Sequence, residues 1–136
     1  SVPVLINTFY PPNQPTVKRC YNFGKSLLRG IEAWDSNARV AVIASGGLTH
    51  FVIDEAIDQI FLQALRDKDI VGLAELGEAT FQDGTSELKN WIPLAGMMAD
   101  LGLDPEIIDY VPCYRSAAGT GNAMGFVSWQ QGRGKP

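Results

Sequence analysis

The order of secondary structure in the first 45 residues constrains the fold more than any other feature of the sequence. Residues 2–7 and residues 39–45 are short, nearly all-apolar runs, which are typical of strands buried on both faces. Between them, apolar side chains recur at every third or fourth position over residues 16–34, which predicts an amphipathic helix. A strand, a helix and a strand in this order favour a parallel pair joined by a right-handed crossover.

The rest of the chain alternates helical and strand-like patterns. The predicted helices are residues 54–66, 69–76 and 86–101, and the predicted strands are residues 107–114 and 122–130. Residues 131–136 are expected to form a loose tail. We therefore predict an α/β fold in which a mixed, largely parallel sheet is flanked by helices, in a single domain of residues 1–136.

Composition excludes several classes of function. The net charge is −4 and no stripe of Lys and Arg is present, so we expect no nucleic-acid partner. No apolar run is long enough to cross a bilayer, and the start of the chain lacks a signal-peptide pattern, so we expect a cytoplasmic protein without a membrane partner. Cys20 and Cys113 have no metal-ligand spacing and are predicted to be buried free thiols in a reducing compartment.

His50 is the only histidine in the sequence, and it follows Gly46 and Gly47 at the end of the second predicted strand. Paired glycines let the backbone turn sharply and leave room for a ligand. Ligands of open α/β sheets bind at the carboxyl edge, where a histidine could act as a general acid or base. The alternative is a half-buried histidine that is hydrogen-bonded to the backbone.

Glu87 is the second candidate, because it extends an apolar stripe of its helix. Trp91, Leu94 and Met98 follow it at the fourth, seventh and eleventh positions. A carboxylate at the end of a buried stripe needs a cation, a metal or a set of hydrogen bonds. The alternative is a helix-capping role with Gly84 as the N-cap, since carboxylates are favoured in a first turn.

Polar residues of two loops are weaker candidates. Asn7, Tyr10 and Asn13 follow the first predicted strand and could line the same crevice as His50, although loop positions often carry such residues. Thr120 and Asn122 lie in a glycine-rich loop that has no P-loop lysine.

A single histidine limits which metal sites the chain can build alone. The common Fe(II) triad of two histidines and one carboxylate needs a second histidine, and a three-histidine zinc site needs two more. No Ser-His-Asp assignment is supported by a nucleophile-elbow motif.

Three stretches resemble one enzyme family: residues 4–12, residues 19–27 and residues 40–50, the last ending in Gly46-Gly47-Leu48-Thr49-His50. They look like the class III extradiol ring-cleaving dioxygenases, the family of the protocatechuate 4,5-dioxygenase beta subunit and of the gallate and 2,3-dihydroxyphenylpropionate dioxygenases. The glycine-to-histidine motif is the most specific of the three. The likeness covers nearly the whole chain, as the C-terminal part of the family's catalytic chain.

The resemblance implies a mechanism and a set of roles. In this family Fe(II) binds both hydroxyls of a catechol and then O2, and the aromatic ring opens beside the diol. His50 matches the family's acid–base histidine, and Glu87 matches its carboxylate iron ligand. Asn7 and Thr120 are expected on the substrate side. The expected partners are a catecholic acid and O2, with a homo-oligomer or a small alpha subunit as further possibilities.

The chain also departs from the family, because the two iron-ligating histidines belong to an N-terminal half that this sequence lacks. We therefore expect a C-terminal fragment that is inactive alone, with the remaining Fe(II) ligands supplied by that half. One alternative is a metal-free binding or regulatory module of the same fold. A second is a hydrolase that uses His50 with an acidic partner, for which the sequence offers no evident nucleophile.

Overall fold

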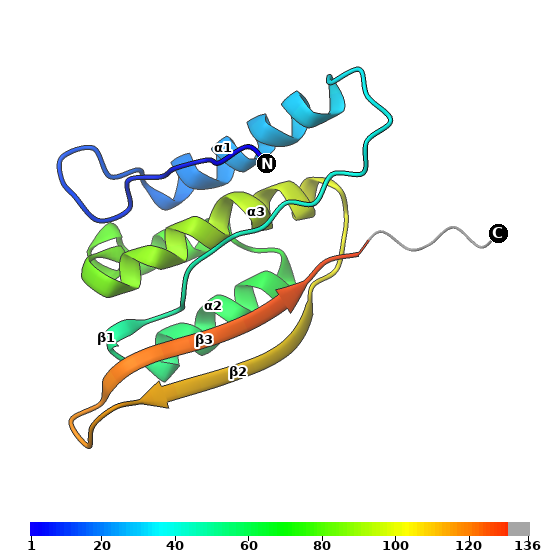
Figure 1. Ribbon diagram of the computed structural model, residues 1–136. Helices are drawn as coiled ribbons and strands as arrows, with labels where there is room; N and C mark the ends of the chain where they lie inside the picture. The colour runs from blue at the N-terminus through cyan, green and yellow to red at the C-terminus, as the bar shows by residue number, and fades with distance from the viewer. Residues whose placement is uncertain (131–136) are drawn as a thin grey trace.

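The structure, a computed structural model, describes residues 1–130, so the predicted tail at 131–136 lies outside the described residues. The helices are α1 (Val17–Glu32), α2 (Glu55–Asp67) and α3 (Leu88–Asp100), with short 3-10 segments η1 (Val71–Leu76), η2 (Glu78–Phe81) and η3 (Asp83–Glu87) between the last two. The strands are β1 (His50–Val52), β2 (Glu106–Tyr114) and β3 (Thr120–Ser128). Figure 1 shows the long β2–β3 hairpin beside α2.

The sheet of the described residues is antiparallel, so the prediction of a largely parallel sheet is wrong. Its strand order is β1-β3-β2, and β3 pairs antiparallel with both neighbours. Helices and strands are mixed, as predicted, but the expected parallel pair of residues 2–7 and 39–45 is missing, because neither run belongs to a strand.

The two apolar runs have an extended trace without a pairing partner among residues 1–130 (Figure 1). Leu5 is 94% exposed and Ile43 is 84% exposed. Branched apolar residues favour extended backbone, but a strand also needs a neighbour for its N–H and C=O groups.

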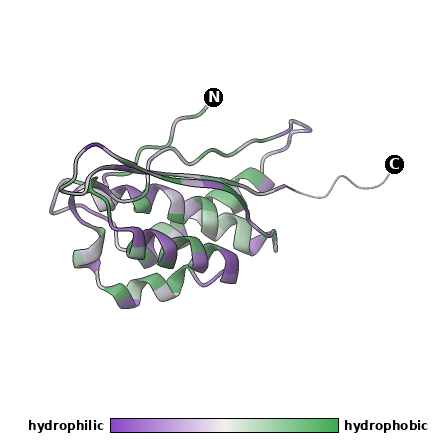
Figure 2. Ribbon diagram, turned by 90° about the horizontal axis from the view of Figure 1, so that it is seen from below, coloured by the Kyte–Doolittle hydropathy of each residue, from purple (hydrophilic) through white to green (hydrophobic). Residues whose placement is uncertain are grey.

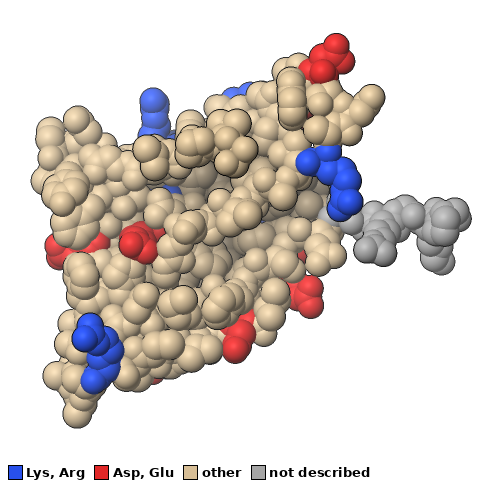
Figure 3. All heavy atoms as spheres, in the orientation of Figure 1, with Lys and Arg blue, Asp and Glu red and all other residues tan. Residues whose placement is uncertain are grey.

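Figure 3 shows the charged side chains on the face of the molecule seen in Figure 1. The Lys and Arg side chains are scattered among the Asp and Glu side chains there and form no basic stripe.

The helices predicted over residues 16–34 and 54–66 are confirmed as α1 and α2, and both begin at a side-chain cap, whereas the helix predicted over residues 69–76 is only the 3-10 segment η1. The Thr16 side chain accepts a hydrogen bond from Arg19 N at 3.2 Å, and Asp54 accepts one from Ile57 N at 3.1 Å. The helix predicted over residues 86–101 begins later than expected, at Leu88, since Gly84 lies inside η3 and does not cap α3. None of the helices in the described part of the chain is long and apolar enough to cross a membrane.

The core lies between the sheet and the helices, which gather on one side of the extended segments (Figure 2). Its largest fully buried side chains include Phe61, Phe81 and Ile92. α1 and α3 pack closely because each contributes a glycine that faces the other helix. A Cβ on Gly24 of α1 would lie 1.9 Å from the carbonyl oxygen of Pro93, and a Cβ on Gly96 of α3 would lie 2.8 Å from the carbonyl oxygen of Tyr21.

The two cysteines differ in their surroundings. Both are free thiols, but only Cys20 is buried, whereas Cys113 on β2 is exposed. The prediction of two buried thiols is therefore wrong for Cys113. A residue on a strand that faces solvent needs no apolar partner, and spacing alone did not indicate which side of the sheet Cys113 faces.

Candidate functional site

His50 and Glu87 lie next to each other although they are far apart in the sequence. His50 Nε2 is 3.4 Å from Glu87 Oε1. His50 begins β1, and Glu87 is the last residue of η3, directly before α3. The histidine side chain is 14% exposed and the carboxylate is 40% exposed, so the pair is reachable from solvent on the glutamate side.

The second ring nitrogen of His50 is bound to the backbone. Nδ1 lies 3.1 Å from the carbonyl oxygen of Leu48. A carbonyl oxygen can only accept, so this bond requires a proton on Nδ1. Nε2 is then the atom that can take up and release a proton, and it is the atom that faces Glu87. The histidine is thus both backbone-bonded and oriented toward a carboxylate.

The glycine pair shapes the space in front of Glu87. Gly47 N donates to Glu87 Oε2 at 3.0 Å. Gly46 has φ +150°, and a Cβ there would lie 3.1 Å from the same carboxylate oxygen and 3.4 Å from Asn90 Nδ2. Small residues at both positions therefore allow the backbone to approach the carboxylate closely.

Asn122 lies closer to His50 than Thr120 does. In the β1–β3 register, His50 is opposite Asn122, whereas Thr120 is opposite Val52. Directly opposite residues of an antiparallel pair project to the same face. The Thr120 hydroxyl lies 2.7 Å from the Ser116 hydroxyl within the hairpin loop.

Asn7 uses its amide group locally. Its Nδ2 donates to Tyr10 O at 2.7 Å, and its Oδ1 accepts from Tyr10 N at 3.0 Å. The residue after it approaches the site: the buried Ser86 hydroxyl, next to Glu87, lies 3.4 Å from the Thr8 hydroxyl. The first loop thus reaches the start of α3 through Thr8.

Sequence reasoning missed a buried polar group behind His50. Asp58 is fully buried and binds Thr49 and Tyr110. Burial raises the pKa of the Asp58 carboxyl above its usual value, and burial with the Asp58 hydrogen bond raises the pKa of Tyr110. The helical spacing of the sequence could have revealed Asp58, because it places this carboxylate on the same buried face of α2 as the apolar side chains Phe61, Leu62 and Leu65.

An ion pair with a buried lysine links α3 to η2, and its glutamate also binds the start of α1. Lys89, 1% exposed, lies with its Nζ 3.1 Å from Glu78 Oε2, and Glu78 Oε1 accepts from Val17 N at 2.9 Å. Cys20 lies beside this pair, and burial raises the pKa of its thiol to about 11. These contacts connect the start of α1 to α3 through Glu78.

The described residues supply only part of a metal site. No group of three or more His, Cys, Asp and Glu side chains within residues 1–130 could hold a metal ion. Glu87 fits as one ligand, because its oxygens are hard donors, one of them is fixed by Gly47 N, and the side chain is partly open to solvent.

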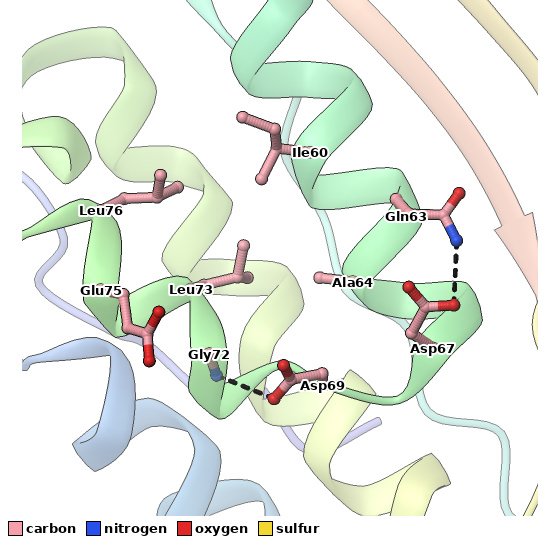
Figure 4. A pocket seen from close by; sticks show the side chains of 9 residues that line it. All are labelled: Ile60, Gln63, Ala64, Asp67, Asp69, Gly72, Leu73, Glu75 and Leu76. Atoms are coloured by element: carbon pink, nitrogen blue, oxygen red, sulfur yellow. Dashed lines mark hydrogen bonds between the residues drawn. The ribbon is translucent and has the colours of Figure 1, made fainter.

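A shallow hollow of about 340 Å³ lies elsewhere, between α2 and η1 (Figure 4). Its carboxylates Asp67 and Asp69 already accept hydrogen bonds from Gln63 and from the backbone of Gly72. It contains neither His50 nor Glu87.

Comparison with known proteins agrees with the resemblance seen in the sequence. The family model of the catalytic LigB subunit of aromatic ring-opening dioxygenase matches residues 1–124. A gallate dioxygenase of Pseudomonas putida is 44% identical over 41 residues, which is 30% of this chain and 12% of that protein's length. No solved structure matches. Because the family model matches most of the sequence, the chain belongs to the family of catalytic LigB subunits of aromatic ring-opening dioxygenases.

Proposed function

We propose that this chain provides the acid–base histidine and one iron ligand of an Fe(II)-dependent extradiol dioxygenase that opens the ring of a catecholic acid with O2. The observation that carries the proposal is the approach of His50 Nε2 to Glu87 Oε1 at 3.4 Å. The two residues match neighbouring roles in the family, and the fold brings them together from separate segments.

Glu87 is the ligand in this proposal. The hydrogen bond from Gly47 N holds one carboxylate oxygen and so fixes the direction of the other. Fe(II) bound there would supply positive charge that favours ionised catechol hydroxyls, and it would supply the redox chemistry that O2 requires.

His50 is the acid–base residue. With Nδ1 donating to Leu48 O, Nε2 faces the glutamate side of the site. Nε2 accepts a proton from a catechol hydroxyl and returns it later in the reaction. Thr120, Asn7 and the closer Asn122 are candidates for contact with the ring substituents, and Asn122 is favoured by its register opposite His50.

The other iron ligands come from outside this sequence. The chain has one histidine, and a facial triad needs two. We assign the missing pair to a further polypeptide segment, which the family's N-terminal half would provide. The exposed apolar side chains of Val2, Leu5 and Ile43 offer a surface for that segment. A homo-oligomer or a small alpha subunit are further partners of the proposed enzyme.

The main alternative is a metal-free binding or regulatory module of the same fold. Its support is that only two potential ligands, His50 and Glu87, converge in the described part of the chain. Such a module would bind a ligand without consuming O2.

Iron content and O2 uptake separate the two functions. The chain is loaded with Fe(II) without air, alone and together with the N-terminal half, and mixed with catecholic acids. We expect stoichiometric iron and O2 uptake only in the combined sample. Glu87→Gln should lose iron, His50→Gln should keep iron but turn over slowly, and Glu75→Gln in the distant hollow should change neither. A combined sample without iron would overturn the dioxygenase proposal in favour of the metal-free module.

A further inference from the structure

Thr49, the residue directly before His50, is bound to a buried carboxylate. Thr49 and Asp58 are both fully buried. The Thr49 backbone N–H donates to Asp58 Oδ1 at 2.8 Å, and the Thr49 hydroxyl donates to Asp58 Oδ2 at 2.9 Å. One carboxylate therefore holds both the main chain and the side chain of the residue that precedes the histidine.

Asp58 has hydroxyl and amide partners but no cation. Its third donor is the Tyr110 hydroxyl, 2.8 Å from Oδ2, and no Lys or Arg within residues 1–130 forms an ion pair with it. Burial raises the pKa of this carboxyl, because removing the charged form from water costs free energy. A buried carboxylate that replaces an apolar side chain seldom adds stability, so its value lies in what it orients.

The network fixes the peptide group between Thr49 and His50 from several sides. Thr49 O accepts from Ala123 N at 2.9 Å, and the Thr49 hydroxyl accepts from Asp54 N at 2.9 Å. Thr49 is thus held directly by Asp58 of α2, by its N-cap Asp54 and by Ala123 of β3, while Tyr110 of β2 acts on it only through Asp58. On the other side, a Cβ on Gly84 would lie 2.0 Å from His50 O, so η3 packs directly against the histidine backbone.

The next residue shows why such restraint is needed. Phe51 has φ +68°, a left-handed conformation that is unfavourable for an aromatic residue. Its side chain is 61% exposed, so burial of the ring does not offset the strain. Strained residues persist where surrounding contacts determine them, and the contacts here are those of Thr49 and of the β1–β3 pairing.

We propose that Asp58 is a positioning residue for His50, which acts through Thr49 and is itself oriented by Tyr110. The proposal rests on the proposed function only for the role of His50 as the acid–base group. The positioning itself keeps Nδ1 on Leu48 O and Nε2 toward Glu87, and it can be measured without turnover.

The test uses nitrogen NMR of the imidazole at a fixed pH, where the single histidine gives an unambiguous signal. Three variants weaken the network: Asp58→Asn, Thr49→Val and Tyr110→Phe. Thr49→Ser keeps the hydroxyl and should therefore keep the network intact. Thr80→Val is the matched control, because Thr80 loses a side-chain hydrogen bond of 2.8 Å to Leu76 O that involves neither Thr49, His50 nor Asp58.

We expect the Nδ1–H signature of His50 to be lost in Asp58→Asn and Thr49→Val, reduced in Tyr110→Phe, and retained in Thr49→Ser and Thr80→Val. Exchange of the Thr49 amide should accelerate by roughly tenfold in Asp58→Asn. If Asp58→Asn does not fold, Thr49→Val and Tyr110→Phe decide. An unchanged ring signature in folded variants would overturn the proposal and leave Asp58 a structural residue.

Kinetics of the iron-loaded enzyme add a second readout. Thr49→Val should lower kcat on the order of tenfold with KM unchanged, and Thr80→Val should not. If Asp58→Asn and Thr49→Val lose the Nδ1–H signature but the wild type has no ring-cleaving activity, the proposed function alone is refuted and the positioning role stands. A lost signature with a normal kcat in Thr49→Val would show that turnover does not need this orientation of His50, and would refute the acid–base role of His50 but not its positioning by Asp58.

Discussion

The segment around His50, where a loop leads into β1, differs from the two exposed apolar runs in how it is held. The backbone around His50 is bound by β3 and by the side chain of Asp58 on α2. Residues 2–6 and 39–45 have no backbone hydrogen bond to the rest of the described chain. The two runs are the more apolar region, but the hydrogen bonds to other elements are found around His50. Hydrophobicity alone therefore does not indicate which segment is rigid.

The largest effect is expected where the His50 backbone is packed most tightly. Gly84→Ala places a Cβ 2.0 Å from His50 O, so a main-chain atom must move. We expect about 3 kcal/mol of lost unfolding free energy, at the upper end of overpacking costs, and a changed imidazole spectrum. Urea unfolding followed by far-UV circular dichroism measures the stability.

Gly30→Ala is the matched control for that substitution. A Cβ at Gly30 meets nothing within 4 Å, and the residue is inside α1. Alanine there should stabilise the protein by roughly 0.5–1 kcal/mol through helix propensity. If Gly84→Ala is as harmless as Gly30→Ala, η3 does not pack tightly against the His50 backbone. The segment around His50 would then be held little more firmly than the two apolar runs.

A second prediction asks whether the first apolar run covers the core. Cys20 lies beneath it, in a small hollow that Leu5 and Ile6 also line. Burial raises the pKa of the thiol from 9.0 to about 11. The folded state therefore binds this proton more tightly than the unfolded state, so its stabilising contribution is complete below pH 9 and is lost as the pH rises toward 11.

The measurement is the free energy of unfolding between pH 8 and pH 11 for wild type and Cys20→Ala. The wild type should lose about 2 kcal/mol more than the variant over this range, since Tyr and Lys titrations are common to both. Equal slopes would mean that residues 2–7 leave the thiol open to water, and that this run is as loosely held as its exposure suggests.

Local patterns in the sequence were sufficient for the helices but not for the sheet. Thr16 and Asp54 cap helices within a few residues, and the helical period is visible in a short window. Strand pairing depends on distant partners, and the sequence pattern does not name them. The turn at Gly46 and Gly47 indicated His50 as a candidate site residue, and this stays a prediction. The partner Tyr110 could not be predicted, because it reaches Asp58 from a strand remote in the sequence.

The smallest effect on stability is expected in the second apolar run. Ile43 is 84% exposed, so Ile43→Asn should change the free energy of unfolding by less than about 0.5 kcal/mol. The fully buried Ile92 is the control, and Ile92→Asn should prevent folding, because it buries an amide without partners. Sedimentation of Ile43→Asn should show less self-association than the wild type, since an exposed apolar patch is removed. Strong destabilisation by Ile43→Asn would instead mean that the run packs on this chain, and that it is held as firmly as the segment around His50.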